Sequence, residues 1–462
     1  MRGIVSAAGY VPFRRLDRGD IPKTFGAGGG KGTRSVASYD EDTTTMGVEA
    51  ARYALKATST RPSSLWFTTA EPAYLDKNNA STVHSALRLD GDIPAFDFGG
   101  ALRSGVGALR AALDGGGTTL IATADMRSGL PTSTDEAQGG DGAAALVIGD
   151  DNVIAEYIGG ASATEEFIER WRTPGSTRSR AWEERFGEVK YAPLVEQAWN
   201  GALKAAEVSA ADVTKLVITG MHARAVRSIS GKLGVAKEAF ADDLSATVGN
   251  TGTAQPALLL TNALESAKAG DVIALVVLAD GVDALVFRVT DKIASYTPAY
   301  TVARQIENGA PIAYGKFLSW RDVVRIEPPR RPEPDRISAS VSGRTEDWKY
   351  GFVGSRDRES GELHLPPARI SRVGDNVDDM EPAPMADVQG TVVLVTVDRI
   401  AYSPSPPITF AVVDWDGGGR LPVELTDADG IEPGDRVEMT FRRLFTSDEI
   451  HNYFWKARPV RG

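Results

Sequence analysis

Roughly the first 290 residues alternate between short apolar runs and longer amphipathic segments, a pattern typical of an α/β protein. The apolar runs at 4–11, 63–70 and 118–125 are short and bounded by turn residues, so they predict buried strands. Residues 43–58 instead space their apolar side chains three and four apart and begin with threonines that can cap a helix. We therefore predict helices layered on sheets.

The alternation then continues over a second stretch of similar length. Residues 181–208 predict a long helix, and residues 215–221 and 271–281 predict strands. Two α/β halves of similar size are what a duplicated fold gives, although no sequence repeat links them. We place these halves at 1–160 and 161–325.

The pattern changes after the α/β part. Residues 327–336 are rich in proline and charge and predict an extended linker within a segment at 326–384. From 385 to 462, short apolar segments are separated by turn residues. This last pattern predicts a small all-β barrel or sandwich.

Composition narrows the functional class. The chain has 462 residues, enough for two or three domains, and a net charge of −11, which argues against general nucleic-acid binding. No run approaches the ~20 apolar residues of a membrane span, and the N-terminus lacks the apolar core of a secretion signal. We expect a cytoplasmic soluble enzyme or enzyme subunit.

The chain contains no cysteine, which excludes disulfides, a cysteine nucleophile and thiolate metal sites. The histidines do not occur at metal-ligand spacing, so we predict no metal site. The glycine-rich segment 25–35 lacks two key positions of a phosphate-binding loop and predicts a surface loop. Ser104 lacks the flanking glycines of a nucleophile elbow and is better explained as a helix cap.

Two polar residues lie at predicted strand ends, where α/β folds place their sites, and a third lies in a turn. Glu71 and His222 each follow a predicted buried strand, and Asn250 lies in a glycine-containing turn. Taken singly, a solvated acid, a hydrogen-bonded structural histidine and a turn asparagine are the simpler interpretations.

Together, however, the segments that contain them resemble hydroxymethylglutaryl-CoA synthases. The similar segments occur in the family's order and are 9–18, 29–55, 68–87, 139–150, 221–234 and 248–260. The resemblance places the family's catalytic glutamate on Glu71, its catalytic histidine on His222 and its oxyanion asparagine on Asn250. It also implies a thiolase fold (a duplicated five-layer αβαβα arrangement), a homodimer, a CoA thioester as substrate and no tightly bound cofactor.

One departure from the family changes the predicted chemistry. The family's nucleophilic cysteine follows an acidic residue by five positions, and the corresponding residues here are Asp97 and Leu102. A leucine cannot form an acyl-enzyme. We therefore reject the family's acylation step for this chain and assign Leu102 to the substrate pocket.

The C-terminal part resembles the zinc-ribbon and OB-fold proteins that partner with thiolase-like enzymes, over 351–392 and 441–459. The ribbon's four cysteine positions fall on Asp357, Ser360, Ser371 and Gly374. These side chains cannot hold a tetrahedral zinc ion. We expect a metal-free ribbon, with packing around these residues: Phe352, Leu365 and Ile370.

These observations predict an acyl-CoA carbon–carbon bond enzyme that uses aldol, retro-aldol or decarboxylative chemistry through an enolate. His222 and Asn250 would hold the enolate oxygen and Glu71 would act as acid/base. Arg227 and Lys232 are candidates for binding CoA phosphates, although a solvated face explains them equally well. Two alternatives stay open: a cysteine-independent acyltransferase to a hydroxyl or amine, and a non-catalytic acyl-CoA-binding scaffold beside a thiolase-like partner.

Overall fold

The computed structural model describes residues 1–461, which form two compact units. The α/β unit comprises residues 1–37, 46–81 and 91–317. The C-terminal unit comprises residues 38–45 and 82–90 together with the chain from residue 318 onward. Two short segments from the first quarter of the sequence thus belong to the C-terminal unit.

The α/β unit is built on a nine-stranded sheet in the order β11-β12-β13-β8-β1-β7-β6-β4-β5. Its strands are β1 (Gly3–Tyr10), β4 (Ser64–Thr69), β5 (Ala95–Gly99), β6 (Thr119–Asp125), β7 (Gly142–Gly149), β8 (Ala155–Ala163), β11 (Lys215–Gly220), β12 (Val272–Leu278) and β13 (Val282–Val289). The predicted strands at 4–11, 63–70 and 118–125 are confirmed as β1, β4 and β6.

The two halves of this sheet repeat one pairing pattern. In the first half β4 runs parallel to β6, which pairs antiparallel with β7; in the second, β11 runs parallel to β12, which pairs antiparallel with β13. The halves join where β1 meets β8 over only two residue pairs. This repeated pairing is what the predicted duplication requires.

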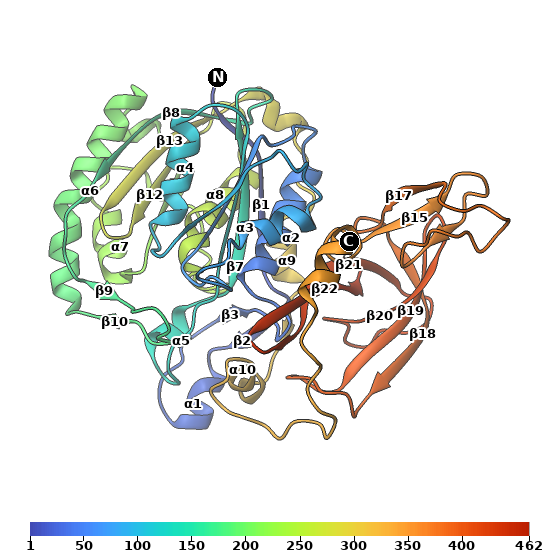
Figure 1. Cartoon of the computed structure of the whole chain (residues 1–462). Helices are drawn as coiled ribbons and strands as arrows, with labels where there is room; N and C mark the ends of the chain where they lie inside the picture. The colour runs from blue at the N-terminus through green and yellow to red at the C-terminus, as the bar shows by residue number, and fades with distance from the viewer. Residues whose placement is uncertain (462) are drawn as a thin grey trace. The chain divides into compact units, whose positions relative to one another are not determined.

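Helices cover both faces of the sheet halves (Figure 1). Helices α4 (Ser104–Asp114) and α8 (Gln255–Glu265) share one apolar core with strands of both halves. Helices α6 (Glu184–Ala206) and α7 (Ala223–Ser230) pack in a second core on the other face of the second half. Near-continuous burial of strands such as β7 and β12 follows from this two-sided cover.

The remaining elements of the α/β unit are short. They are β2 (Arg14–Asp17), α1 (Asp20–Phe25), β3 (Thr33–Val36), α5 (Thr134–Gln138), β9 (Arg170–Trp171), β10 (Arg180–Ala181), α9 (Val302–Glu307) and β14 (Ala310–Pro311). Helix α2 (Thr43–Lys56) contributes to the unit from residue 46 onward.

The C-terminal unit contains a five-stranded antiparallel sheet in the order β20-β19-β18-β21-β22. Its strands are β18 (Gly390–Asp398), β19 (Ile408–Trp415), β20 (Arg420–Glu424), β21 (Arg436–Ser447) and β22 (Ile450–Pro459). Between the two edge strands there is one isolated bridge, which joins Leu425, directly after β20, to Ala457 of β22. No continuous ladder closes the sheet within residues 1–461, so the predicted closed OB-fold barrel is not confirmed.

A three-stranded sheet precedes it, formed by β15 (Val353–Asp357), β16 (Leu363–His364) and β17 (Met380–Pro384). Of the three apolar side chains expected to pack this segment, Phe352 and Leu365 are buried, but Ile370 is 64% exposed. The expectation for Ile370 is wrong, because the residue lies outside the three strands and forms only an isolated bridge with Val377.

Hydrogen bonds instead gather around Asp357. Its carboxylate accepts from Ser360 Oγ at 2.6 Å and from Asn376 Nδ2 at 2.5 Å, and it is also bonded by Ser371. These hydrogen bonds, led by the one from Ser360, hold the pKa of Asp357 well below its usual range. The C-terminal unit also includes α3 (Ala80–Ala86) from residue 82, α11 (Ala339–Arg344) and α12 (Glu346–Lys349), while α10 (Tyr314–Trp320) crosses the boundary between the units.

None of the helices within residues 1–461 combines the length and apolarity needed to cross a bilayer.

Candidate functional site

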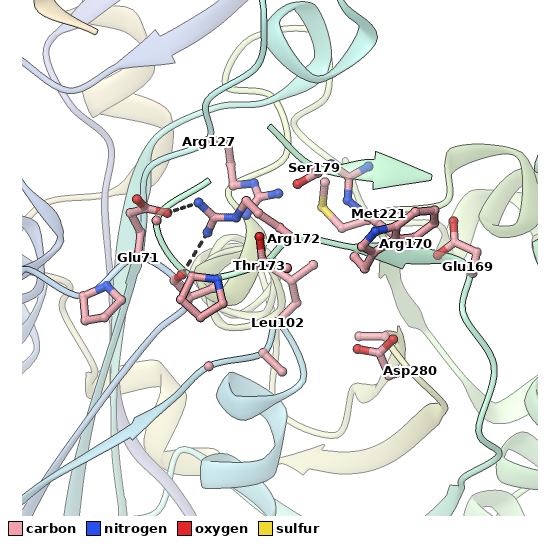
Figure 2. A pocket seen from close by; sticks show the side chains of 18 of the residues that line it. Glu71, Leu102, Arg127, Glu169, Arg170, Arg172, Thr173, Ser179, Met221 and Asp280 are labelled. Carbon is pink, nitrogen blue, oxygen red and sulfur yellow. Dashed lines mark hydrogen bonds and ion pairs between the residues drawn. The ribbon is translucent and has the colours of Figure 1, made fainter. Parts of the chain in front are cut away.

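A cavity of about 550 Å³ opens in the α/β unit where several strands end (Figure 2). Five of its lining residues come within three positions of the carboxyl ends of β4, β5, β6, β11 and β12: Glu71, Leu102, Arg127, Met221 and Asp280. The carboxyl ends of parallel strands are where open α/β sheets place ligands. The irregular segment 169–175, which contains β9, supplies much of the remaining wall.

Glu71 lies on this wall in an ion pair. Its Oε2 is 2.5 Å from Nη1 of Arg172, and Arg172 Nη2 also donates to the carbonyl of Ala70 at 2.9 Å. The Glu71 side chain is 47% exposed and that of Arg172 is 20% exposed. The carboxylate can therefore meet a ligand in the cavity while a cation orients it (Figure 2).

Leu102 reaches the same cavity from the turn between β5 and α4. An apolar side chain thus lies at the position where the resemblance predicts the lost nucleophile. Ser104, two residues further on, is not part of the cavity lining, and its hydroxyl donates to the carbonyl of Gly99 at 3.0 Å. The serine is therefore not placed to replace a nucleophile.

His222 is the N-cap residue of α7 and is almost fully buried. Its Nδ1 accepts from the backbone N–H of Ala225 at 3.0 Å, so the proton lies on Nε2, which is 2.9 Å from the carbonyl of Glu184. Both ring nitrogens are thus engaged by backbone. His222 is not among the cavity-lining residues, whereas its neighbour Met221 is.

Both polar atoms of the Asn250 side chain are also hydrogen-bonded to backbone groups. Its Nδ2 donates to the carbonyl of Gly220 at 3.1 Å, and its Oδ1 accepts from the backbone N–H of Gly252 at 2.9 Å. It does not line the cavity either. The structure therefore brings Glu71 and Leu102 to one cavity, and the roles of His222 and Asn250 stay predictions.

Arg227 and Lys232 lie on and just after α7 with exposed side chains. Neither lines the cavity. Their proposed contact with CoA phosphates also stays a prediction.

Sequence reasoning missed the arginines of the wall. Arg127, Arg170 and Arg172 all line the cavity. Arg170 forms an ion pair with Asp135 at 2.8 Å, and Arg127 lies 3.6 Å from Asp125. No motif marks these positions, and the one available signal is that Arg127 closely follows a buried strand.

The wall also holds two acids with shifted pKa values. Burial raises the pKa of Glu169, an effect that His222 opposes, and burial likewise raises the pKa of Asp280, opposed by Arg103. Carboxyl groups with raised pKa values in a cavity wall are candidates for proton transfer. Throughout residues 1–461, no cluster of three or more histidine or acidic side chains is arranged to hold a metal ion.

Comparisons with known proteins show which families this chain is similar to. Residues 203–289 match the family model for the C-terminal part of 3-oxoacyl-[acyl-carrier-protein] synthase III. The chain is 30% identical to a hydroxymethylglutaryl-CoA synthase of Thermococcus sibiricus over 281 residues, covering 58% of this chain and 80% of that protein. It is 28% identical to the synthase of Methanocaldococcus jannaschii over 350 residues, covering 71% of this chain and 100% of that protein.

Solved structures show the same likeness at lower identity. A hydroxymethylglutaryl-CoA synthase complexed with CoA superposes with a TM-score of 0.59 at 17% identity, covering 73% of this chain and 95% of that one. A 3-oxoacyl-[acyl-carrier-protein] synthase III from Aquifex aeolicus gives 0.54 at 20% identity, covering 62% and 100%. The predicted thiolase-like α/β fold is thereby confirmed.

Proposed function

The chain belongs to the hydroxymethylglutaryl-CoA synthase family, and from this premise we propose that it makes or breaks a carbon–carbon bond on an acyl-CoA thioester without a covalent acyl-enzyme. One observation carries the proposal: Glu71 and Leu102 line the same cavity at the strand ends. A carboxylate is in place for proton transfer, and Leu102, in the turn before α4, presents only an apolar side chain to the cavity. Since the chain has no cysteine, the thiol on which acylation depends is absent.

The chemistry that fits is aldol cleavage or its reverse. In the cleavage direction, the Glu71 carboxylate accepts the proton of a β-hydroxyl group. The bond between Cα and Cβ then breaks, its electron pair passes to the thioester as an enolate, and a carbonyl compound leaves. Glu71 returns the proton to Cα of the enolate, which gives the shorter acyl-CoA. Condensation runs through the same steps in reverse.

The enolate oxygen needs N–H donors, each worth roughly 3–4 kcal/mol in comparable acyl-transfer sites. We propose His222 and Asn250 for this role, on the basis of the family resemblance. In this structure their donors bind the carbonyls of Glu184 and Gly220. A bound thioester oxygen would therefore have to replace those carbonyls as the acceptor.

The test is turnover by Glu71→Gln. Purified protein is incubated with β-hydroxyacyl-CoAs, or with acetyl-CoA and aldehydes, and products are followed by mass spectrometry. We expect turnover to fall at least about 100-fold, because general acid–base catalysis contributes that much, while CoA-ester binding is retained. Glu196→Gln, an exposed glutamate outside the cavity, is the matched control. Unchanged turnover in Glu71→Gln would reject the proposal.

A non-catalytic acyl-CoA-binding subunit is the second candidate. The observation that favours it is the engagement of both His222 and Asn250 by backbone groups. Tight binding of CoA esters without turnover in any of these assays would select it.

We further propose that the C-terminal unit is a metal-free relative of the zinc-ribbon and OB-fold proteins. The strand order of its five-stranded sheet and the bridge between Leu425 and Ala457 support this relation. Of the four positions that correspond to zinc ligands in those proteins, Ser360 and Ser371 are hydrogen-bonded to a third, Asp357. A bound metal in the purified protein, measured by elemental analysis at stoichiometric amount, would contradict it.

A further inference from the structure

The three arginines in the cavity wall each have a carboxylate partner within the chain. The pairs are Arg172 with Glu71, Arg170 with Asp135 and Arg127 with Asp125, at nitrogen–oxygen distances of 2.5, 2.8 and 3.6 Å. Each of these cations thus already faces a carboxylate. The arginines therefore give no separate indication of an anionic ligand.

Two acids in the same wall lack a partner of this kind. Glu169 and Asp280 both line the cavity, and no lysine or arginine nitrogen of residues 1–461 lies within 4.0 Å of either carboxylate. Neither carboxylate accepts a hydrogen bond from these residues. Only 10% of the Glu169 side chain is exposed. Its charge is therefore removed from water without compensation, which is unfavourable.

The neighbouring basic groups do not compensate the two acids. Nε2 of His222 lies 4.0 Å from Glu169, but the ring carries a single proton because Nδ1 accepts from a backbone N–H. Arg103, which acts on Asp280, pairs with Asp283 at 2.8 Å. Besides burial, the charge of Asp280 contributes to the raised pKa of Glu169. The two carboxyl groups are thus close enough to influence one another.

The backbone holds Asp280 at this position. The residue lies in the short loop between β12 and β13 with a φ of 46°, in the left-handed region that costs energy for a residue other than glycine. Nη1 of Arg103 donates to its carbonyl at 2.9 Å, and the hydroxyl of Tyr191 is hydrogen-bonded to its backbone. These contacts fix the main chain and leave the carboxylate to the cavity.

Two uncompensated carboxylates in one cavity favour a cationic ligand. The donor set does not suit a metal ion, because no third acidic or histidine ligand joins these acids within residues 1–461 and Nε2 of His222 carries a proton. An aliphatic ammonium group has three N–H donors, enough for both carboxylates. Trp171 and Tyr191 also line the cavity, and aromatic rings attract a cation further.

The place of the two acids indicates which part of the substrate they meet. Figure 2 shows Glu169 and Asp280 on the other side of the cavity from Glu71. In the proposed reaction Glu71 accepts the proton of the β-hydroxyl group, so Cβ lies beside Glu71 and its substituent extends across the cavity. We infer that this substituent carries an ammonium group, bound by Glu169 and Asp280.

This inference rests on the proposed function and names the class of its second substrate. The carbonyl compound that leaves on cleavage, or adds on condensation, is then an amino aldehyde or amino ketone. A neutral carbonyl compound leaves Glu169 and Asp280 without a cation and binds less tightly.

Binding measured by calorimetry tests this without turnover. The probes are 6-aminohexanoyl-CoA, heptanoyl-CoA (of the same length but with a methyl group in place of the ammonium) and CoA alone. Neither ester has a β-hydroxyl group to be cleaved. For the wild type we expect 6-aminohexanoyl-CoA to bind about tenfold more tightly than heptanoyl-CoA, the effect of one charge-assisted contact.

The variants Glu169→Gln and Asp280→Asn remove one charge each. Each should lose most of this preference, and the double variant should bind the two esters equally, with the affinity for heptanoyl-CoA unchanged in all three. That unchanged affinity also shows that the variants are folded. Glu169→Asp, which retains the charge, should keep part of the preference. Glu183→Gln is the matched control, because Glu183 is exposed and does not line the cavity.

Three outcomes overturn the inference. Equal binding of the two esters by the wild type would mean that the acids do not receive an ammonium group, while the proposed function would stand. An equal loss of affinity for both esters in the variants would mean that the two acids only shape the cavity. Absence of binding by all three probes would remove the proposed function as well.

Discussion

Two arginines of this protein, Arg172 and Arg442, differ in what surrounds them. Arg172 lies on the cavity wall of the α/β unit, 20% exposed, with Glu71 as its ion-pair partner. Arg442 lies in the C-terminal unit with no exposed surface, and pairs with Glu41 at 2.7 Å and with Asp427 at 3.2 Å. Both are guanidinium–carboxylate interactions, but only the first is open to a ligand.

The buried interactions around Arg442 extend further. Lys456, also fully buried, lies 3.0 Å from Asp40 and 2.8 Å from Glu424. Asp40 and Glu41 belong to the segment 38–45, which is some 400 residues away from Arg442 in sequence but part of the same unit. Fully desolvated charges with several partners hold a chain segment in place, whereas a partly exposed pair in a cavity is available for function.

Replacing each of the two arginines by methionine should separate these roles, and of the predictions made here it should change the free energy of unfolding most. Arg442→Met leaves Glu41 and Asp427 buried without their cation, and we expect it to lower the free energy of unfolding by about 3–5 kcal/mol. Arg172→Met should lower it by less than about 1 kcal/mol, since its pair is partly exposed. Urea unfolding followed by circular dichroism measures both; equal losses would remove the distinction.

Glu265 sharpens the comparison because it is a half-buried carboxyl group whose pKa is shifted without any cation among the causes. Burial raises the pKa of Glu265 to about 7 from 4.5, although the backbone N–H of Val302 opposes the shift. The folded state therefore binds a proton that the unfolded state releases above pH 4.5. Its stabilisation is complete below that pH and is lost as pH rises through 7, by roughly 3 kcal/mol in all.

Glu265→Gln removes this titration because the amide stays neutral. The free energy of unfolding of the wild type and the variant should be similar near pH 4.5, and the variant should become the more stable protein above pH 7. Urea unfolding between pH 4.5 and 8 checks this. Parallel pH profiles for the two proteins would show that Glu265 is not protonated in the fold.

The smallest expected effect concerns Asp357, a carboxylate held by neutral donors. Because its pKa is lowered, the stabilisation it gives is present above its unfolded pKa of about 4 and is lost as pH falls. Asp357→Asn should therefore be less stable than the wild type at pH 7, by less than Arg442→Met. The difference should shrink in thermal unfolding below pH 4, and a constant difference would contradict the assignment.

The features that could be predicted from the sequence are those that depend on the pattern of apolar and polar residues within a short segment. Short apolar runs in the sequence predicted strands β1, β4 and β6. Glu71 follows one of these strands and lies in the cavity wall, as expected for a polar residue at a strand end of an α/β sheet. Leu102 follows from the family resemblance and is also in the cavity wall. These predictions needed only local periodicity and the order of segments.

The rest depends on contacts between distant parts of the chain. The pair of Glu71 with Arg172 spans about a hundred residues, and Arg172 lies in an irregular segment that carries no motif. The pairing of Glu41 with Arg442 likewise has no local signal. The sequence allowed a hydrogen-bonded structural histidine at position 222, but not that His222 is a helix cap, because this depends on where α7 begins.

Intact-protein mass spectrometry during turnover tests the central claim most directly. The protein is mixed with a β-hydroxyacyl-CoA that it cleaves, quenched within a single turnover and weighed. The account predicts that the shorter acyl-CoA and the carbonyl product appear while the protein mass stays that of the unmodified chain. A protein species heavier by the mass of the acyl group, formed and lost at the rate of turnover, would contradict it.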